Sequence, residues 1–188
     1  MATTSAMDRA AAVRQAMRTL VARHGLHGTS MSAIAKEAGV AQGTAYAHYD
    51  SKQQLLLAAY LELKREMGTG ACADIDPSAG PHDRFIQVWL GVYRFLATEP
   101  ERAQFLLQLE SSPYARMAHE VGMAVPDDPL MAEATTLLAA GVLAPLDLDV
   151  LYDLAFGPAI RRAAAGGGVD ERSAVVLAEA CWRAITTG

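Results

Sequence analysis

Two short helical patterns that meet at a glycine, in residues 30–49, constrain the fold of this chain more than any other part of its sequence. Small or apolar residues at helical spacing mark one face of each pattern: Ile34, Ala35 and Ala38 in the first, Ala45 and Tyr49 in the second. Gly39 lies in the turn, where one residue commonly takes a left-handed conformation that a side chain disfavours. The segment is therefore predicted to form a helix-turn-helix.

The rest of the chain also has helical periodicity, and no segment shows the alternation typical of a strand. Further helices are predicted in residues 7–24, 51–67, 81–98, 100–110, 114–123, 127–144, 149–165 and 170–186. Residues 68–81 collect turn residues instead, so a connecting loop is predicted there. The fold class is predicted to be all-α, with a three-helix helix-turn-helix domain in residues 1–50 and a second helical domain in residues 51–188.

Several helix ends carry recognisable capping residues. Gly25 can end the first helix in a left-handed conformation. Thr29 or Ser30 can cap the second helix, and Ser51 precedes Gln54 by the three residues of a capping box.

The overall charge of −5 hides a strong polarity along the chain. Residues 1–52 contain six Lys and Arg against three Asp and Glu, a net charge of +3, whereas the remaining residues contain ten against eighteen, a net charge of −8. A basic segment beside an acidic one is typical of a DNA-binding module joined to a module that does not meet phosphates. Chance clustering of charges on solvated faces is the alternative.

Composition argues against several other classes of protein. No apolar run approaches the roughly 18 residues of a membrane helix. The N-terminus does not resemble a secretion signal, so a cytoplasmic location is expected. Cys72 and Cys181 have no Cys or His at ligand spacing, so neither a metal site nor a disulfide is expected, and no cofactor is predicted.

The last two predicted helices are apolar over an unusually broad surface. A helix that is apolar on most sides is buried on most sides, and its second covering surface can be another subunit. A homodimer interface is therefore predicted at Leu151, Leu154, Phe156, Val175, Trp182 and Ile185. The alternative is that both faces pack inside one chain.

Residues 28–57, with a supporting helix before them and an all-α remainder, resemble the TetR family of bacterial transcriptional regulators. The wider resemblance covers residues 7–64. It implies homodimers that bind palindromic double-stranded DNA operators and release them when a small-molecule effector enters the C-terminal domain.

The resemblance also implies which residues meet DNA. It places five residues on the exposed side or first turn of the recognition helix: Gln42, Thr44, Tyr46, Ala47 and His48. A glutamine can pair with adenine, and hydroxyl groups can donate to phosphate oxygens. Ser30 and Lys52 would contact the flanking backbone, and Gly43 would permit close approach to DNA.

Two positions depart from the family pattern. Ala41 stands where a capping Ser or Thr is common, and Ala45 where a larger aliphatic residue is common. The first removes a helix cap, and the second reduces packing beneath the recognition helix.

An effector pocket is predicted among aromatic and methionine residues of the second domain. The candidates are Trp89, Tyr93, Phe105, Tyr114, Met117 and Met123. They would form an apolar pocket with a few polar groups, which suits a lipophilic or aromatic ligand. At each position an ordinary core role is the alternative.

Together these features predict a ligand-responsive DNA-binding regulator, most simply a repressor, and not an enzyme. The alternatives are a transcriptional activator, a protein-interaction module, or an all-α enzyme or ligand carrier with an incidental helix-turn-helix. Glu110 with His119 is the nearest suggestion of an acid-base pair, and no nucleophile accompanies it in the sequence.

Overall fold

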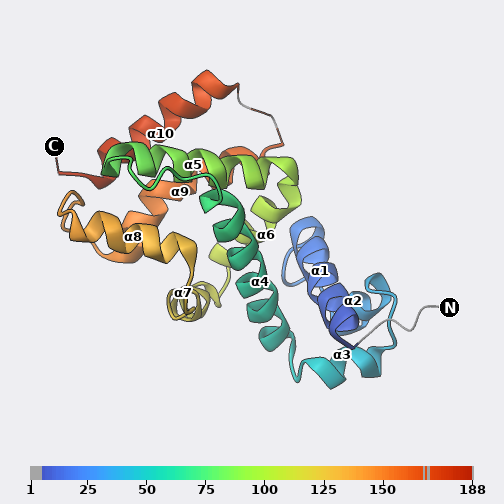
Figure 1. The fold of residues 1–188 in the computed structure, drawn as a ribbon. Coiled ribbons are helices and arrows are strands. Elements are labelled where there is room, and N and C mark those ends of the chain that lie inside the picture. Colours follow the sequence, from blue (N-terminus) through green and yellow to red (C-terminus); the bar gives the residue numbers. More distant parts are fainter. Residues whose placement is uncertain (1–5, 167, 169, 188) are drawn as a thin grey trace.

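The computed structural model describes residues 6–166, 168 and 170–187, and these residues form ten α-helices (Figure 1). Among them there is no strand, only an isolated antiparallel bridge between Leu143 and Thr186. The predicted all-α class is therefore confirmed. None of the described helices is long and apolar enough to cross a membrane.

Three helices form the N-terminal unit: α1 (Ala6–His24), α2 (Met31–Glu37) and α3 (Gln42–His48). Gly25 ends α1 with φ 71°, and its N–H donates to the Val21 carbonyl at 2.9 Å. Gly39 has φ 66° in the turn between α2 and α3. Both glycines occupy the left-handed region that other residues disfavour, as the sequence predicted.

Hydroxyl caps begin two of the helices. Ser30 Oγ accepts from the Ala33 N–H at 3.2 Å at the start of α2, and Ser51 Oγ accepts from the Gln54 N–H at 3.1 Å at the start of α4. Gln54 Oε1 in turn accepts from the Asp50 N–H at 2.6 Å, one residue before the position that a capping box would use.

Helix α4 (Lys52–Cys72) runs diagonally through the molecule and continues beyond its predicted end (Figure 1). The prediction of a loop from residue 68 onward is wrong for residues 68–72, because glycines there serve packing rather than turning. A Cβ on Gly68 would lie 3.1 Å from Asp128 Oδ1, and one on Gly91 of the next helix would lie 2.4 Å from the Ala71 carbonyl oxygen. Helix α4 is therefore closely approached on two sides.

The C-terminal unit adds six helices: α5 (Pro81–Thr98), α6 (Pro100–Glu110), α7 (Ala115–Met123), α8 (Pro129–Ala139), α9 (Leu148–Ala164) and α10 (Glu171–Ile185). Helices α5, α6 and α8 each begin with proline, which suits the first turn of a helix. Helix α8 ends five residues before the predicted boundary at residue 144. The inward stripe of α5, predicted from its spacing, is at most 3% exposed: Phe85, Trp89, Val92 and Leu96.

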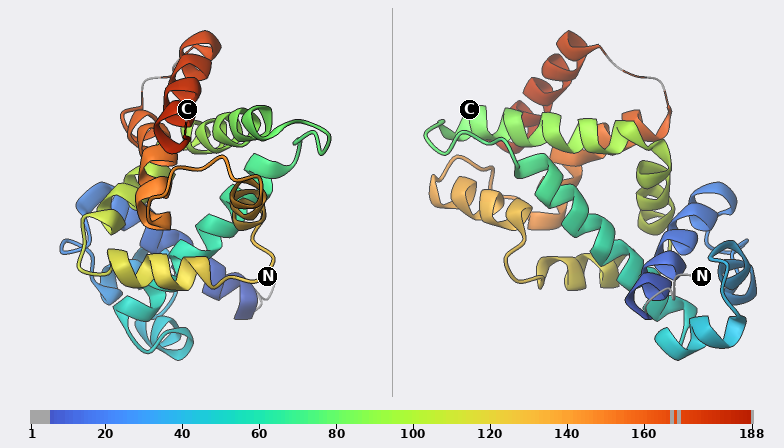
Figure 2. Two further views of the ribbon diagram at one scale, coloured as in Figure 1. Left: turned by 90° about the vertical axis from the view of Figure 1, so that its left-hand side faces the viewer. Right: turned by 45° about the vertical axis from the view of Figure 1, so that its right-hand side comes forward.

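Helices α5, α6 and α9 pack together, α10 lies across α5 and α9, and α7 and α8 both contact α4 (Figure 2). The two units are not separated by a gap, because α1 packs against both α4 and α6. One hydrophobic cluster runs from Val13 in α1 to Ile185 in α10. Helix α1 therefore packs against helices of both units.

Candidate DNA-binding and effector sites

Helix α3 separates its buried and exposed faces cleanly. Ala45 is fully buried and Tyr49, at its C-terminal end, is 8% exposed, whereas Tyr46 is 46% exposed. The side chains predicted to meet DNA lie on the exposed side or at its edge: Gln42, Gly43, Tyr46 and Ala47 are exposed, and Thr44 and His48 are half-buried. The predicted core position of Tyr49 is confirmed.

One of the two departures from the family pattern has a visible effect in α3. Ala41 occupies the N-cap, where no side chain accepts a hydrogen bond from the first turn. The Thr44 N–H donates to the Ala41 carbonyl at 2.9 Å, so the backbone alone closes the first turn.

Lys52 and Ser30, which are predicted to contact the DNA backbone, differ in the hydrogen bonds that they form within the protein. Lys52 Nζ donates to the carbonyl oxygens of Leu26 and Thr29, at 2.8 and 2.9 Å. Two of its three donors therefore hold the loop between α1 and α2. Ser30 is exposed, and besides capping α2 it shares a hydrogen bond with Ser32.

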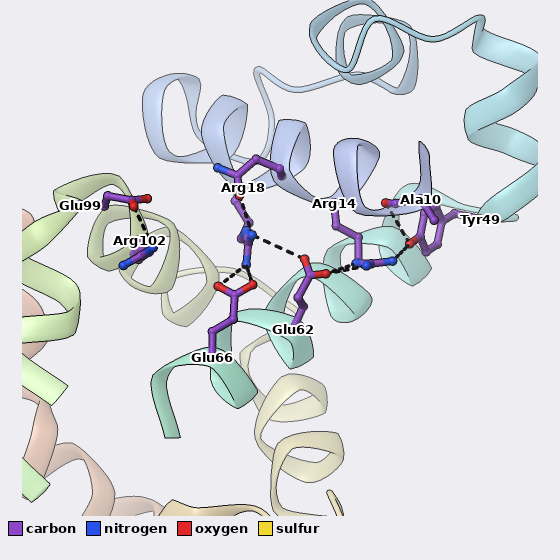
Figure 3. Close-up of polar contacts among 9 residues, drawn as sticks. Ala10, Arg14, Arg18, Tyr49, Glu62, Glu66, Glu99 and Arg102 are labelled. Carbon is purple, nitrogen blue, oxygen red and sulfur yellow. Dashed lines mark hydrogen bonds and ion pairs between the residues drawn. The ribbon is translucent and has the colours of Figure 1, made fainter. Parts of the chain in front are cut away.

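Arg14 links the recognition helix to α4 (Figure 3). Its Nε and Nη2 donate to Glu62 Oε1 at 2.8 and 2.5 Å, and its Nη1 donates to the Tyr49 hydroxyl at 2.7 Å. The hydrogen bonds that Arg14 donates to Glu62 are the main cause that raises the pKa of Arg14 above its ordinary value, and burial opposes this shift. The end of α3 is thereby fixed to α4 through α1.

A second arginine repeats this arrangement one turn along α1. Arg18 Nη1 donates to both oxygens of Glu66 at 3.2 Å, and its Nη2 lies 3.5 Å from Glu62 (Figure 3). Part of the positive charge of the N-terminal unit is therefore paired with glutamates of α4. The arginines are four residues apart, as are the glutamates, and this matched spacing is the sequence signal that could have suggested the pairing.

An apolar cavity of about 130 Å³ lies between α4, α5, α7, α8 and α9. Its lining is mainly aliphatic and aromatic, with Tyr60, Lys64, His119, Glu133, Asp149 and Tyr152 as its polar members. An engineered apolar cavity of about 150 Å³ holds benzene, so this space suits a ligand body of similar size.

Of the six residues predicted for the effector pocket, only Met123 lines this cavity. Trp89 and Phe105 are fully buried in the core, and Tyr93 stacks on Trp89 with ring centroids 5.8 Å apart. Tyr114 is half-buried and Met117 is 39% exposed. The structure does not bring these six residues together, because Trp89, Tyr93 and Phe105 pack in the core.

Three residues predicted for the dimer interface line the cavity instead: Leu151, Phe156 and Ile185. Trp182 is half-buried, with its ring centroid 5.4 Å from those of His82 and Phe85. Val175 is half-buried and Leu154 is 37% exposed. Much of the apolar breadth of α9 and α10 is therefore used within one chain.

Charged groups around the cavity occur in pairs that join different helices. Lys64 of α4 forms a buried ion pair with Asp128, which caps α8. Arg84 of α5 donates to both oxygens of Glu133 in α8, at 2.6 and 3.0 Å. Burial lowers the pKa of Lys64 to about 8 and raises the pKa of Tyr60 to about 12.

The family described as bacterial regulatory proteins, tetR family, matches residues 13–59. An uncharacterized HTH-type transcriptional regulator of Haemophilus influenzae is 31% identical over 183 residues, which cover 95% of this chain and 96% of that protein. The chain belongs to the TetR family. It is an HTH-type transcriptional regulator.

Two further similarities agree with this assignment. The HTH-type transcriptional regulator BetI of Agrobacterium fabrum is 40% identical over 78 residues, 42% of this chain and 37% of that one. The crystal structure of a TetR-family transcriptional regulator from Haemophilus influenzae superposes with a TM-score of 0.76 at 28% identity, covering 96% of this chain and 98% of that one. These relatives are regulators of transcription.

The one acid-base pair suggested by the sequence does form in this TetR-family chain. His119 Nε2 lies 2.7 Å from Glu110 Oε1, joining α7 to the end of α6. No cluster of three or more potential metal ligands occurs in the described part of the chain. Of the two residues, His119 lines the cavity.

Proposed function

We propose that this TetR-family regulator is a homodimeric repressor that binds a palindromic operator and is released by a small lipophilic or aromatic effector. The observation that carries the proposal is the position of α4. One face of this helix holds α1 and α3 through Glu62, and another face lines the apolar cavity through Tyr60 and Lys64. A ligand that shifts α4 would also shift the recognition helix.

The exposed face of α3 supports the DNA-binding part of the proposal. Gln42, in its first turn, carries an amide that can pair with adenine N6 and N7 in the major groove. Tyr46 and Thr44 carry hydroxyls that can donate to phosphate oxygens. Gly43, with no atom within 4 Å of a Cβ built on it, leaves room for a close backbone approach.

Exposed apolar side chains on the last two helices support the homodimer. Val150 and Leu154 of α9 are 42% and 37% exposed, and Val176 of α10 is 63% exposed. Side chains of this kind on neighbouring helices suit a self-complementary interface about a two-fold axis. Two recognition helices must then lie roughly 34 to 36 Å apart to enter successive major grooves.

Selection from random DNA duplexes tests the proposal. The selected duplexes should share a palindrome. When this operator is placed upstream of a reporter gene, the protein should lower transcription of the reporter, whereas an activator would raise it. Gln42→Ala should relax the preference at one base pair of each half-site. Gln108→Ala, at an exposed glutamine on α6, is the matched control and should leave the selected sequence unchanged.

Recovery of no common sequence would contradict the DNA-binding proposal. Unchanged base preference in Gln42→Ala would contradict only the role given to that side chain.

A further inference from the structure

One corner of the apolar cavity carries two polar side chains from α4. Tyr60 and Lys64 are four residues apart and therefore share one face of the helix. Both press against Gly122 of α7: a Cβ there would lie 2.7 Å from the Tyr60 hydroxyl oxygen and 3.3 Å from Lys64 Cδ. The glycine leaves space for these two polar groups at the cavity wall.

The ammonium group of Lys64 has unused hydrogen-bonding capacity. The residue is 8% exposed, and its Nζ is paired with Asp128 alone among the described residues. An ammonium has three donors, and a buried donor without an acceptor is costly. Asp128 directs Oδ2 at this ammonium, and its Oδ1 accepts from the Leu130 N–H at 3.0 Å and caps α8.

The remaining charges of the cavity are already satisfied or lie at its rim. Both oxygens of Glu133 accept from Arg84, and His119 is paired with Glu110. Asp149 is exposed. Asp128 does not line the apolar cavity, so a ligand inside it reaches Lys64 but not the carboxylate that Lys64 is paired with.

Lys64 also stands at the boundary of a second hollow, of about 280 Å³, whose lining includes Arg65, Asp127 and Asp128. The apolar cavity therefore ends in a polar region at this residue. A ligand that fits both parts must have an apolar body and a charged or polar head.

We propose that the effector is an amphipathic monocarboxylate, whose apolar body fills the cavity and whose carboxylate accepts hydrogen bonds from the Lys64 ammonium and the Tyr60 hydroxyl. This inference rests on the proposed function and narrows its effector to one chemical class. The incoming carboxylate takes up the donors that Asp128 leaves free, so Lys64 lies between the two anions. The size of the cavity suits a body of about six carbons, and a longer chain extends through the mouth.

Three probes with the same body and different heads test the inference: octanoate, 1-octanol and octylamine. Their affinities are measured by isothermal titration calorimetry with the full chain in the absence of DNA, at a pH near 6.5 where Lys64 is protonated. Octanoate should bind at least about tenfold more tightly than 1-octanol, because a charge-assisted hydrogen bond is stronger than a neutral one. Octylamine should bind more weakly than either.

Variants test whether the Lys64 ammonium is the group that binds the carboxylate. Lys64→Met combined with Asp128→Asn removes both charges together, keeps the aliphatic stem, and retains an amide oxygen that can cap α8, so no buried charge is left unpaired. In this double variant octanoate should lose its advantage over 1-octanol. Asp128→Asn alone should retain the advantage, and Lys36→Met, at an exposed lysine on α2, is the control and should behave as the wild type.

The inference is overturned if octanoate does not bind, if octanoate and 1-octanol bind equally, if octylamine binds best, or if the double variant retains the advantage of octanoate. Operator binding is measured separately on the same proteins. Octanoate binding without operator binding would therefore refute the proposed function and leave the carboxylate site standing, and the reverse result would refute the site alone.

Discussion

Arg14 hydrogen-bonds both Tyr49, at the end of the recognition helix, and Glu62, in the helix that lines the cavity, so its removal should weaken both stability and DNA binding. Arg14→Met keeps an apolar stem and deletes the guanidinium. The variant loses two hydrogen bonds to Glu62 and one to the Tyr49 hydroxyl. Glu62 keeps a second partner, because Arg18 lies 3.5 Å from its other oxygen.

The expected loss of stability follows from the burial of the Arg14–Glu62 pair. The side chains of Arg14 and Glu62 are 23% and 22% exposed, so the interaction is intermediate between an exposed ion pair, worth about 0 to 1 kcal/mol, and a fully buried one, whose breaking costs about 3 to 5 kcal/mol. We expect a loss of about 2 kcal/mol in the free energy of unfolding. For a chain of this length that corresponds to a fall of roughly 4 to 8 °C in the thermal midpoint.

A double-mutant cycle with Tyr49→Phe isolates the contact that reaches the recognition helix. Denaturant unfolding of the wild type, both single variants and the double variant should give a coupling energy of about 0.5 to 1.5 kcal/mol. Operator affinity should fall in both single variants. Arg116→Met removes one side of an exposed pair with Glu120, at 93% and 64% exposure, and serves as the control. A coupling energy indistinguishable from zero, or a loss no greater than that of the control, would refute the reasoning.

Two further predictions concern the DNA contact and the α5 to α10 junction. Tyr46→Phe should weaken binding to all duplexes by a similar factor, measured by fluorescence anisotropy, because a hydroxyl that meets phosphate carries no base preference; a change confined to certain sequences would contradict this role. The hydrogen bond of His82 to Glu179, followed by that to Asp83, raises the pKa of the imidazole. Its stabilising effect is complete below the ordinary pKa of 6.5 and is lost as the pH rises through the higher pKa of the folded state. The difference in thermal midpoint between the wild type and His82→Gln should therefore be larger at about pH 5.5 than at about pH 8.5, and the opposite trend would contradict the assignment.

Local spacing was sufficient to predict the helix-turn-helix and most helix boundaries. The buried positions of Ala45 and Tyr49 follow from a four-residue period within one short segment. The left-handed conformation of Gly39 follows from the turn alone. Each of these inferences depends on residues that are close together in the sequence.

The cavity could not be predicted in the same way, because distant segments create it. Gly122 is informative only when α7 is known to approach Tyr60 and Lys64 of α4. The aromatic residues of α5 were reasonable candidates by composition, yet Trp89 is fully buried and donates through Nε1 to the Ala155 carbonyl at 2.8 Å. Burial of that kind depends on which helix covers which face, and the periodicity of one helix does not contain that information.

The pairing of α1 with α4 also joins segments that are distant in the sequence. Arg14 and Glu62 are 48 residues apart in the sequence. In the sequence Arg14 therefore belongs to the basic segment and Glu62 to the acidic one. In the folded chain the Arg14–Glu62 ion pair joins the basic segment to the acidic one and so links the two units.

The most direct test of DNA binding through the exposed face of α3 is the affinity for the selected duplex as a function of salt. Fluorescence anisotropy should show affinity falling steeply, with a linear relation between the logarithms of affinity and salt concentration, because each phosphate contact releases condensed counterions. Tyr46→Phe lowers the affinity at every salt concentration in this account. Affinity for the duplex that is absent, or that does not change with salt, would contradict the account.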